Sequence, residues 1–213
     1  MPKEIRLAIW IVLFVLVVLA FLFWIIYPII LKKWMSKHPK QAFYKKIIKI
    51  ANYRDYYLIN EFKVHPEDDY SPSVDHLLLG NKYIYLIYDY YFEGAVDASL
   101  EDDYWIYHKM DKTKVKINNP IKKSKKITEY FAVANSIDPA YMVTIVLINN
   151  DCFISPIKNA SKKENLVTLS KLEKLINSYE SQDIGSFDEK GMNRLIELFA
   201  EKKNNARSKE EKI

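Results

Sequence analysis

Two aspartates are the first candidates for chemistry in this sequence. Asp75 and Asp89 lie in Val74–Gly94, VDHLLLGNKYIYLIYDYYFEG, a stretch dominated by aliphatic and aromatic residues. Carboxylates are the ligands that Mg²⁺ prefers. The composition excludes several other chemistries. No glycine-rich loop exists for P-loop hydrolysis, the single cysteine, Cys152, rules out a disulfide or a multi-cysteine metal site, and the four histidines include no close pair.

The stretch that carries the two aspartates is predicted to be a β-hairpin. Gly80-Asn81 is typical of a tight two-residue connection that reaches positive φ. Tyr83–Phe92, broken only by Asp89, indicates a strand buried on both faces. Because adjacent strand residues point to opposite faces, Asp89 should face away from Tyr88 and Tyr90, toward a lysine or a helix N-terminus.

A cluster of lysines offers a second kind of chemistry, the binding of phosphates. Eight lysines lie between positions 109 and 126 and are opposed only by Asp111. The predicted nucleic-acid contacts among them are Lys116, Lys122, Lys123, Lys125 and Lys126. Tyrosines that could stack bases are Tyr104, Tyr107 and Tyr130. The same lysines also fit a solvated face, so both interpretations stay open.

The elements that must position these residues follow from hydrophobic spacing. Helices are predicted at 41–53, 120–135, 170–179 and 186–202. Long strands are predicted at 56–64, in the hairpin and at 141–148, with short strands between them. Capping boxes open the last two helices, Ser170 with Glu173 and Ser186 with Glu189. The order predicts an α/β fold with a mixed central sheet flanked by helices.

One transmembrane helix should precede this domain. Leu7–Leu31 is twenty-five residues without a charge, about 37 Å of helix against a hydrocarbon core of about 30 Å. A cleaved signal peptide is disfavoured because no small-residue cleavage site follows the apolar run. The resulting segments are 1–6 before the membrane, 7–31 across it, a basic juxtamembrane linker at 32–40, the α/β domain at 41–203 and a charged tail at 204–213.

Positive charge predicts the orientation of this helix. Lys3 and Arg6 precede it, whereas seven lysines and no acid lie between 32 and 49. The positive-inside rule therefore places the C-terminal domain in the cytoplasm and the N-terminus outside, as a single-pass protein of the cell membrane. The lysines expected at the anionic membrane surface are Lys32, Lys33, Lys37 and Lys40.

Five segments carry a family resemblance over residues 41–200. They are YYLINEF, VDHLLLGNKYIYLI, the Tyr-x-x-Gly region ending at Gly94, NNPIKKSKKITEY, and YMVTIVLINN followed by LVTLSKLEKLI. In this order and spacing the chain resembles the nuclease-related domain (NERD) family, a branch of the restriction-endonuclease-like superfamily. Family members often carry an N-terminal membrane helix. The resemblance implies a restriction-endonuclease-like fold and metal-assisted phosphodiester hydrolysis.

The resemblance also implies a set of site residues, of which only part is present. Asp75 matches an expected hairpin aspartate. The expected Glu-x-Lys falls on Tyr88 and Tyr90, and an expected glutamine falls on Lys123. Phe43-Tyr44 stands where an acid is expected on the first helix. A phenol with a pKa of about 10 is neutral at pH 7 and is a poor ligand for a hard cation.

These substitutions favour a catalytically inactive member of the family. The leading hypothesis is a membrane-anchored cytoplasmic binding or scaffold module that needs no cofactor and contacts the lipid bilayer. Its further partner would be a cytoplasmic protein or, weakly, a nucleic acid. The alternative is an active Mg²⁺-dependent nuclease with relocated ligands Asp75, Asp89 and Glu93. A third hypothesis is a purely structural domain that pairs with another membrane complex.

Overall fold

The computed structural model describes residues 3–64, 72–155 and 165–210. The chain divides into two compact units, Met1–Ala42 and Phe43–Ile213. The first unit is built on α1 (Lys3–Lys37), and the second is an α/β domain. The α/β fold with a mixed sheet flanked by helices is therefore confirmed.

Helix α1 is long and apolar enough to cross a membrane, over the span Ile9–Lys37. It is the one helix of the described residues with that length and composition. Its large apolar side chains are exposed along the span, as a helix that packs against lipid requires. The helix continues to Lys37, so most of the expected linker at 32–40 is helical, and α2 (Pro39–Arg54) begins two residues later.

A five-stranded mixed sheet forms the centre of the second unit. Its strands, in spatial order, are β1 (Tyr57–Lys63), β2 (Ser73–Leu79), β3 (Ile84–Tyr90), β7 (Met142–Ile148) and β9 (Leu166–Thr168). The first three are antiparallel to one another, and β3, β7 and β9 are parallel. The first five residues of β3 are buried, as its apolar run predicts.

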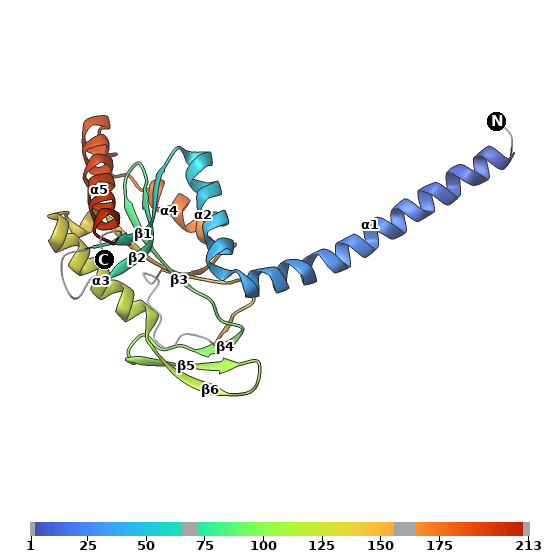
Figure 1. The fold of residues 1–213 in the computed structure, drawn as a ribbon, viewed down its shortest axis with the longest axis horizontal. Coiled ribbons are helices and arrows are strands. Elements are labelled where there is room, and N and C mark those ends of the chain that lie inside the picture. The colour runs from blue at the N-terminus through green and yellow to red at the C-terminus, as the bar shows by residue number, and fades with distance from the viewer. Residues whose placement is uncertain (1–2, 65–71, 156–164, 211–213) are drawn as a thin grey trace. The chain divides into compact units, whose positions relative to one another are not determined.

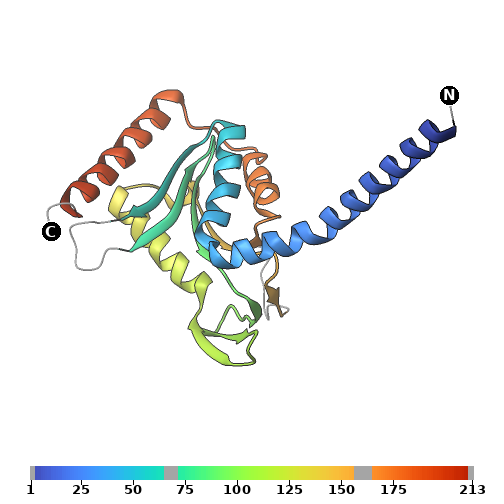
Figure 2. The ribbon, with the colours of Figure 1, turned by 45° about the vertical axis from the view of Figure 1, so that its right-hand side comes forward.

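Helices cover both faces of this sheet. Figure 2 shows α3 (Pro120–Asn135) and α5 (Glu189–Glu210) on one face, and α2 and α4 (Leu172–Glu180) on the other. On the first face, Phe62, Phe131 and Phe199 pack ring to ring with centroids 5.5–5.7 Å apart. On the second, Lys46 of α2 forms an ion pair with Glu173 of α4 at 3.2 Å.

A second sheet has four strands that the sequence pattern did not resolve as one unit. They are β6 (Lys114–Asn118), β5 (Tyr104–Lys109), β4 (Gly94–Asp97) and β8 (Phe153–Ile154), in that spatial order. It lies beyond the end of β3, near the start of α3 (Figure 1). Residues 95–103 are acidic and their sequence predicts a loop, but residues 94–97 form a strand because they pair with both β5 and β8.

Three local predictions were wrong. The tight hairpin turn is centred on Asn81-Lys82 rather than on Gly80-Asn81, since the Gly80 amide donates to the Tyr83 carbonyl at 2.9 Å, and no described glycine has positive φ. Gly80 is needed for space instead, because a Cβ there would lie 2.9 Å from the Tyr85 ring. The capping boxes are also absent. Helix α4 begins after Lys171 without a side-chain cap, and the Asp188 carboxylate accepts from the Gly191 amide at the start of α5.

Candidate functional site

Asp75 shares one face of the sheet with the two tyrosines that replace the expected Glu-x-Lys. The register of β2 with β3 places Asp75 level with Tyr88, on the side covered by α3. The Tyr88 hydroxyl lies 3.3 Å from the Thr128 hydroxyl, which also accepts from Thr144 at 2.9 Å. Burial is the main cause that raises the pKa of Tyr88 above its usual 10, and Asp75 adds to it. Both effects keep this phenol protonated and neutral.

Tyr90 lies in the same surroundings. Burial raises its pKa, and the charge of Asp75 adds to the shift. The remaining degenerate position, Lys123, is exposed on the first turns of α3, whereas its neighbour Ser124 is buried. The face around Asp75 is therefore lined by uncharged phenols and threonine hydroxyls, which are weak ligands for a hard cation.

Asp89 points to the opposite face, as strand alternation predicts. Its backbone amide donates to the Asp75 carboxylate at 2.9 Å, while its own carboxylate meets His76 Nε2 at 2.8 Å. The other ring nitrogen, Nδ1, lies 2.6 Å from Asn60 Oδ1, and the Tyr44 ring stacks on the imidazole. His76 is neither the lysine nor the helix N-terminus that was expected there. Because both its nitrogens are used, His76 has none left for a substrate or a metal.

This Asn60–His76–Asp89 cluster was missed from the sequence, although a signal for it exists. Asn60 and His76 are cross-strand partners, and His76 also pairs with Ile87, two residues before Asp89. Laying three strands side by side would have placed the three polar groups on one face. Because the carboxylates of Asp75 and Asp89 point to opposite faces of the sheet, the alternative ligand set Asp75, Asp89 and Glu93 is not brought together around one metal position. Searching the described residues finds no group of three or more His, Cys, Asp or Glu side chains that could hold one metal ion.

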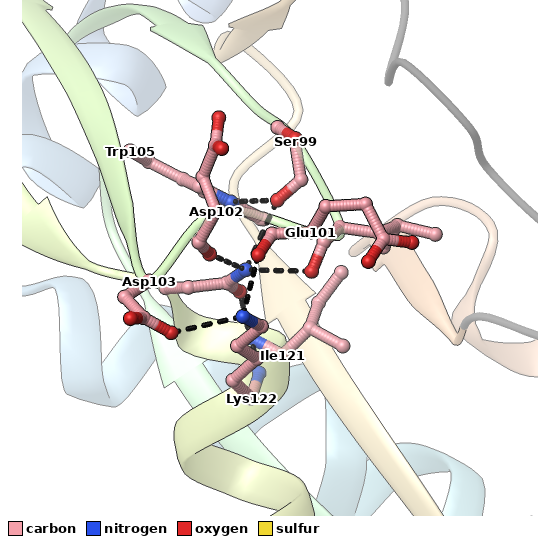
Figure 3. Close-up of polar contacts among 9 residues, drawn as sticks. Ser99, Glu101, Asp102, Asp103, Trp105, Ile121 and Lys122 are labelled. Atoms are coloured by element: carbon pink, nitrogen blue, oxygen red, sulfur yellow. Dashed lines mark hydrogen bonds and ion pairs between the residues drawn. The ribbon is translucent and has the colours of Figure 1, made fainter.

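The predicted nucleic-acid lysines lie mostly around the start of α3. Lys122 donates to the Glu101 carbonyl at 2.6 Å and to the Asp103 carboxylate at 2.9 Å (Figure 3). This pairing lowers the pKa of Asp103, and Lys126 contributes through its charge. The same pairing explains why Lys122 is tolerated in the first turn of α3, where a positive charge would otherwise oppose the helix dipole. Lys122 is thus held by the loop rather than free for a ligand.

Three of the other four lysines line two hollows, and the fourth, Lys116, contacts an aromatic ring. Lys123 and Lys126 line a hollow of about 340 Å³ together with Asp103, Tyr104 and Asn119. Lys116 places its ammonium 3.9 Å from the centre of the Tyr104 ring, a close cation–π contact. Lys125 lies apart from them and lines a different cavity of about 280 Å³ with Thr144 and Tyr179. Four of the five predicted lysines are therefore brought together.

Only one of the three tyrosines proposed for base stacking is in a position to do so. Tyr104 is 47% exposed beside the lysines. Tyr107 packs against Phe92 with ring centroids 5.2 Å apart, and Tyr130 packs against the core between the large sheet and α3. The lysines expected at the membrane surface, Lys32, Lys33, Lys37 and Lys40, are all exposed.

Comparisons of the chain with protein-family models, with curated proteins and with solved structures give no match. The family resemblance therefore stays a prediction.

Proposed function

We propose that the chain is a membrane-anchored binding module, built on a restriction-endonuclease-like scaffold of the NERD type, that does not cleave phosphodiesters. The observation that carries this proposal is the pair of phenols beside Asp75. A hydrolytic site would present an acid and an amine at Tyr88 and Tyr90, and neither phenol can replace them. The order of helices and strands that the sequence predicts for the domain is also the order found in the structure.

The rest of the site is consistent with binding rather than hydrolysis. The histidine nearest to Asp75 in sequence, His76, uses both ring nitrogens in contacts with Asn60 and Asp89. The phenol of Tyr88 is packed among threonine hydroxyls and is 3% exposed, so little room exists for water to attack a substrate there. A binding role needs no cofactor, whereas Mg²⁺ would be required by the hydrolytic alternative.

The anchor in this proposal is α1, and the lysines near its C-terminal end set the orientation. Lys32, Lys33, Lys37 and Lys40 follow the apolar span, so the α/β unit lies in the cytoplasm and the N-terminus outside. Protease treatment of sealed membrane vesicles tests this. The α/β unit should be digested in inside-out vesicles and protected in right-side-out vesicles. The reverse pattern, or release of the protein by alkaline carbonate, would contradict the proposed anchoring.

A nuclease assay tests the central claim. Full-length protein in detergent micelles is incubated with supercoiled plasmid and with single-stranded DNA, in Mg²⁺ and separately in Mn²⁺. We expect the wild type to leave both substrates intact, and Asp75→Ala to behave identically. Cleavage that is lost in Asp75→Ala but retained in Glu61→Ala, an exposed acid on the neighbouring strand, would establish an active nuclease instead.

A further inference from the structure

The second sheet has one face in the core and one face exposed. Its inward residues include Val96, Trp105 and Ile154, which pack with Ile121 of α3. The register assigns the alternate residues to the outer face in three rows. These rows are Phe153, Ala95, His108 and Lys114; Asp97, Ile106 and Lys116; and Tyr104 with Asn118. Phe153, Tyr104 and Ile106 of this outer face are exposed within the described residues of the second unit.

The outer face combines exposed rings with cations. Phe153 is 67% exposed and Tyr104 is 47% exposed. Lys114 and Lys116 stand on the edge strand of the same face, and Lys116 contacts the Tyr104 ring. The acid on this face, Asp97, is paired with His108 at 2.7 Å, which also lowers its pKa. The charge of Lys114 also contributes to lowering the Asp97 pKa, whereas Lys116 on the same strand contacts the Tyr104 ring.

Tyr104 lies at the border of two hollows with different chemistry. On one side is the lysine hollow of about 340 Å³, with Lys123 and Lys126. On the other is a hollow of about 560 Å³ lined by four residues with hydrogen-bond acceptors, Asp97, Ser99, Asp102 and Ser155, and by two aliphatic side chains, Ala98 and Ile106. Tyr104 thus lines both a hollow with lysines and Asp103 and a hollow with several hydrogen-bond acceptors.

We propose that this outer face binds single-stranded nucleic acid. One base stacks on Tyr104, its exocyclic amine turns toward the carboxylates of the larger hollow, and the adjoining phosphates lie near Lys116, Lys123 and Lys126. Aromatic stacking with backbone-directed lysines is the general physics of single-strand binding. This proposal rests on the proposed function, since it names the ligand of a module that binds without cleaving.

The observations favour a single strand over the other polyanions. A duplex keeps its bases stacked inside, so it could use the lysines but gain nothing from Tyr104. An acidic peptide would likewise use the lysines, while its carboxylates would be repelled by Asp97 and Asp102. Only an unpaired base with a phosphate on each side offers a ring, a hydrogen-bond donor and negative charge at the required places.

Fluorescence anisotropy of labelled 12-mers tests the proposal. Full-length protein in nanodiscs of zwitterionic lipid is titrated into dT12, dC12, a 12-bp duplex and a peptide of twelve glutamates, with EDTA to prevent cleavage. We expect the single strands to bind tightest, and a slope of log K against log[salt] of about −2, from three phosphate contacts at about −0.7 each. Tyr104→Ala should weaken dC12 binding by roughly 5- to 150-fold.

Matched variants distinguish binding at this site from binding that depends only on the overall positive charge of the protein. Lys126→Gln should make the salt slope shallower by about 0.7, whereas Lys125→Gln, on the same helix but at another cavity, should leave it unchanged. Tyr53→Ala removes a 78% exposed tyrosine next to Arg54 on α2 and should have no effect. Equal loss in Tyr53→Ala and Tyr104→Ala overturns the site, and so does equal or tighter binding of the duplex or the peptide.

The two proposals fail in distinguishable ways. Absence of oligonucleotide binding at low salt would reject the single-strand site and leave the non-cleaving module untouched. Cleavage of the same oligonucleotides once Mg²⁺ replaces EDTA would reject the non-cleaving module, even if Tyr104→Ala still weakens binding.

Discussion

Asn119 connects the start of α3 to the acidic loop before β5, and its removal should destabilise the fold measurably. The side chain is 2% exposed. Its Oδ1 accepts from the amides of Ile121 at 2.9 Å and Lys122 at 3.3 Å, which caps the helix. Its Nδ2 donates to the carbonyls of Ser99 at 3.0 Å and Asp102 at 2.8 Å. One side chain therefore fixes both the helix and the loop.

The magnitude follows from these contacts. Loss of an N-cap costs about 1 kcal/mol, and loss of two hydrogen bonds to loop carbonyls costs about 1 kcal/mol each. Asn119→Ala should thus lower the free energy of unfolding by about 3 kcal/mol, or Tm by about 6–12 °C for a domain of this size. Asn119→Ser keeps a capping oxygen but has no amide donor, so its cost should be about 2 kcal/mol.

Urea unfolding of the full-length protein in detergent micelles, followed by far-UV circular dichroism, measures these differences. Asn118→Ala is the matched control, because Asn118 is the exposed neighbour at the end of β6, and it should cost less than about 0.5 kcal/mol. The expected order of stability is Asn118→Ala, then Asn119→Ser, then Asn119→Ala. The reasoning is refuted if Asn119→Ser is as damaging as Asn119→Ala, or if Asn118→Ala matches either.

Two further predictions concern the core and the buried thiol. Phe199 is fully buried against Phe62 and Phe131, so Phe199→Ala should cost about 3–5 kcal/mol in urea unfolding, whereas Glu197→Ala on the exposed side of α5 should be neutral. Burial raises the pKa of Cys152 to about 11. As the pH rises, the thiol loses its proton in the unfolded state before it does so in the folded state. The stability that the protonated, buried thiol contributes is therefore fully present below pH 9 and is lost between pH 9 and 11. At pH 8, a thiol reagent should label native protein far more slowly than denatured protein, and equal rates would contradict the burial.

The large sheet could be predicted because its strands carry their own signal. Tyr83–Phe92 and 141–148 are apolar on both faces, which only a covered central strand tolerates, and both became buried strands of the sheet. Helix α3 was equally clear, since Asn119-Pro120 marks its start and the apolar positions recur at helical spacing. Signals of this kind are local, so one sequence is enough to read them.

The second sheet could not be predicted in the same way, because it depends on non-local pairing. Residues 94–97 hold only one strongly apolar side chain and sit in an acidic run, so their local preference is for loop. They become a strand because β5 and β8 lie on either side of them. Phe153 and Ile154 are only two residues long and give no periodic signal. The exposed face with Tyr104 was hidden for this reason.

At the candidate site, the sequence gives the residue types, whereas their surroundings are seen only in the structure. The resemblance predicts a Glu and a Lys at Tyr88 and Tyr90, but the sequence does not indicate which contacts the phenols make. The structure shows Tyr88 bonded to Thr128 and packed within the core under α3. Placing Glu and Lys at these positions would bury two charges in this environment, where an unpaired charge is very costly. The surroundings of Asp75 therefore suit neutral side chains, and introducing Glu and Lys at the two tyrosines would not by itself create a metal site.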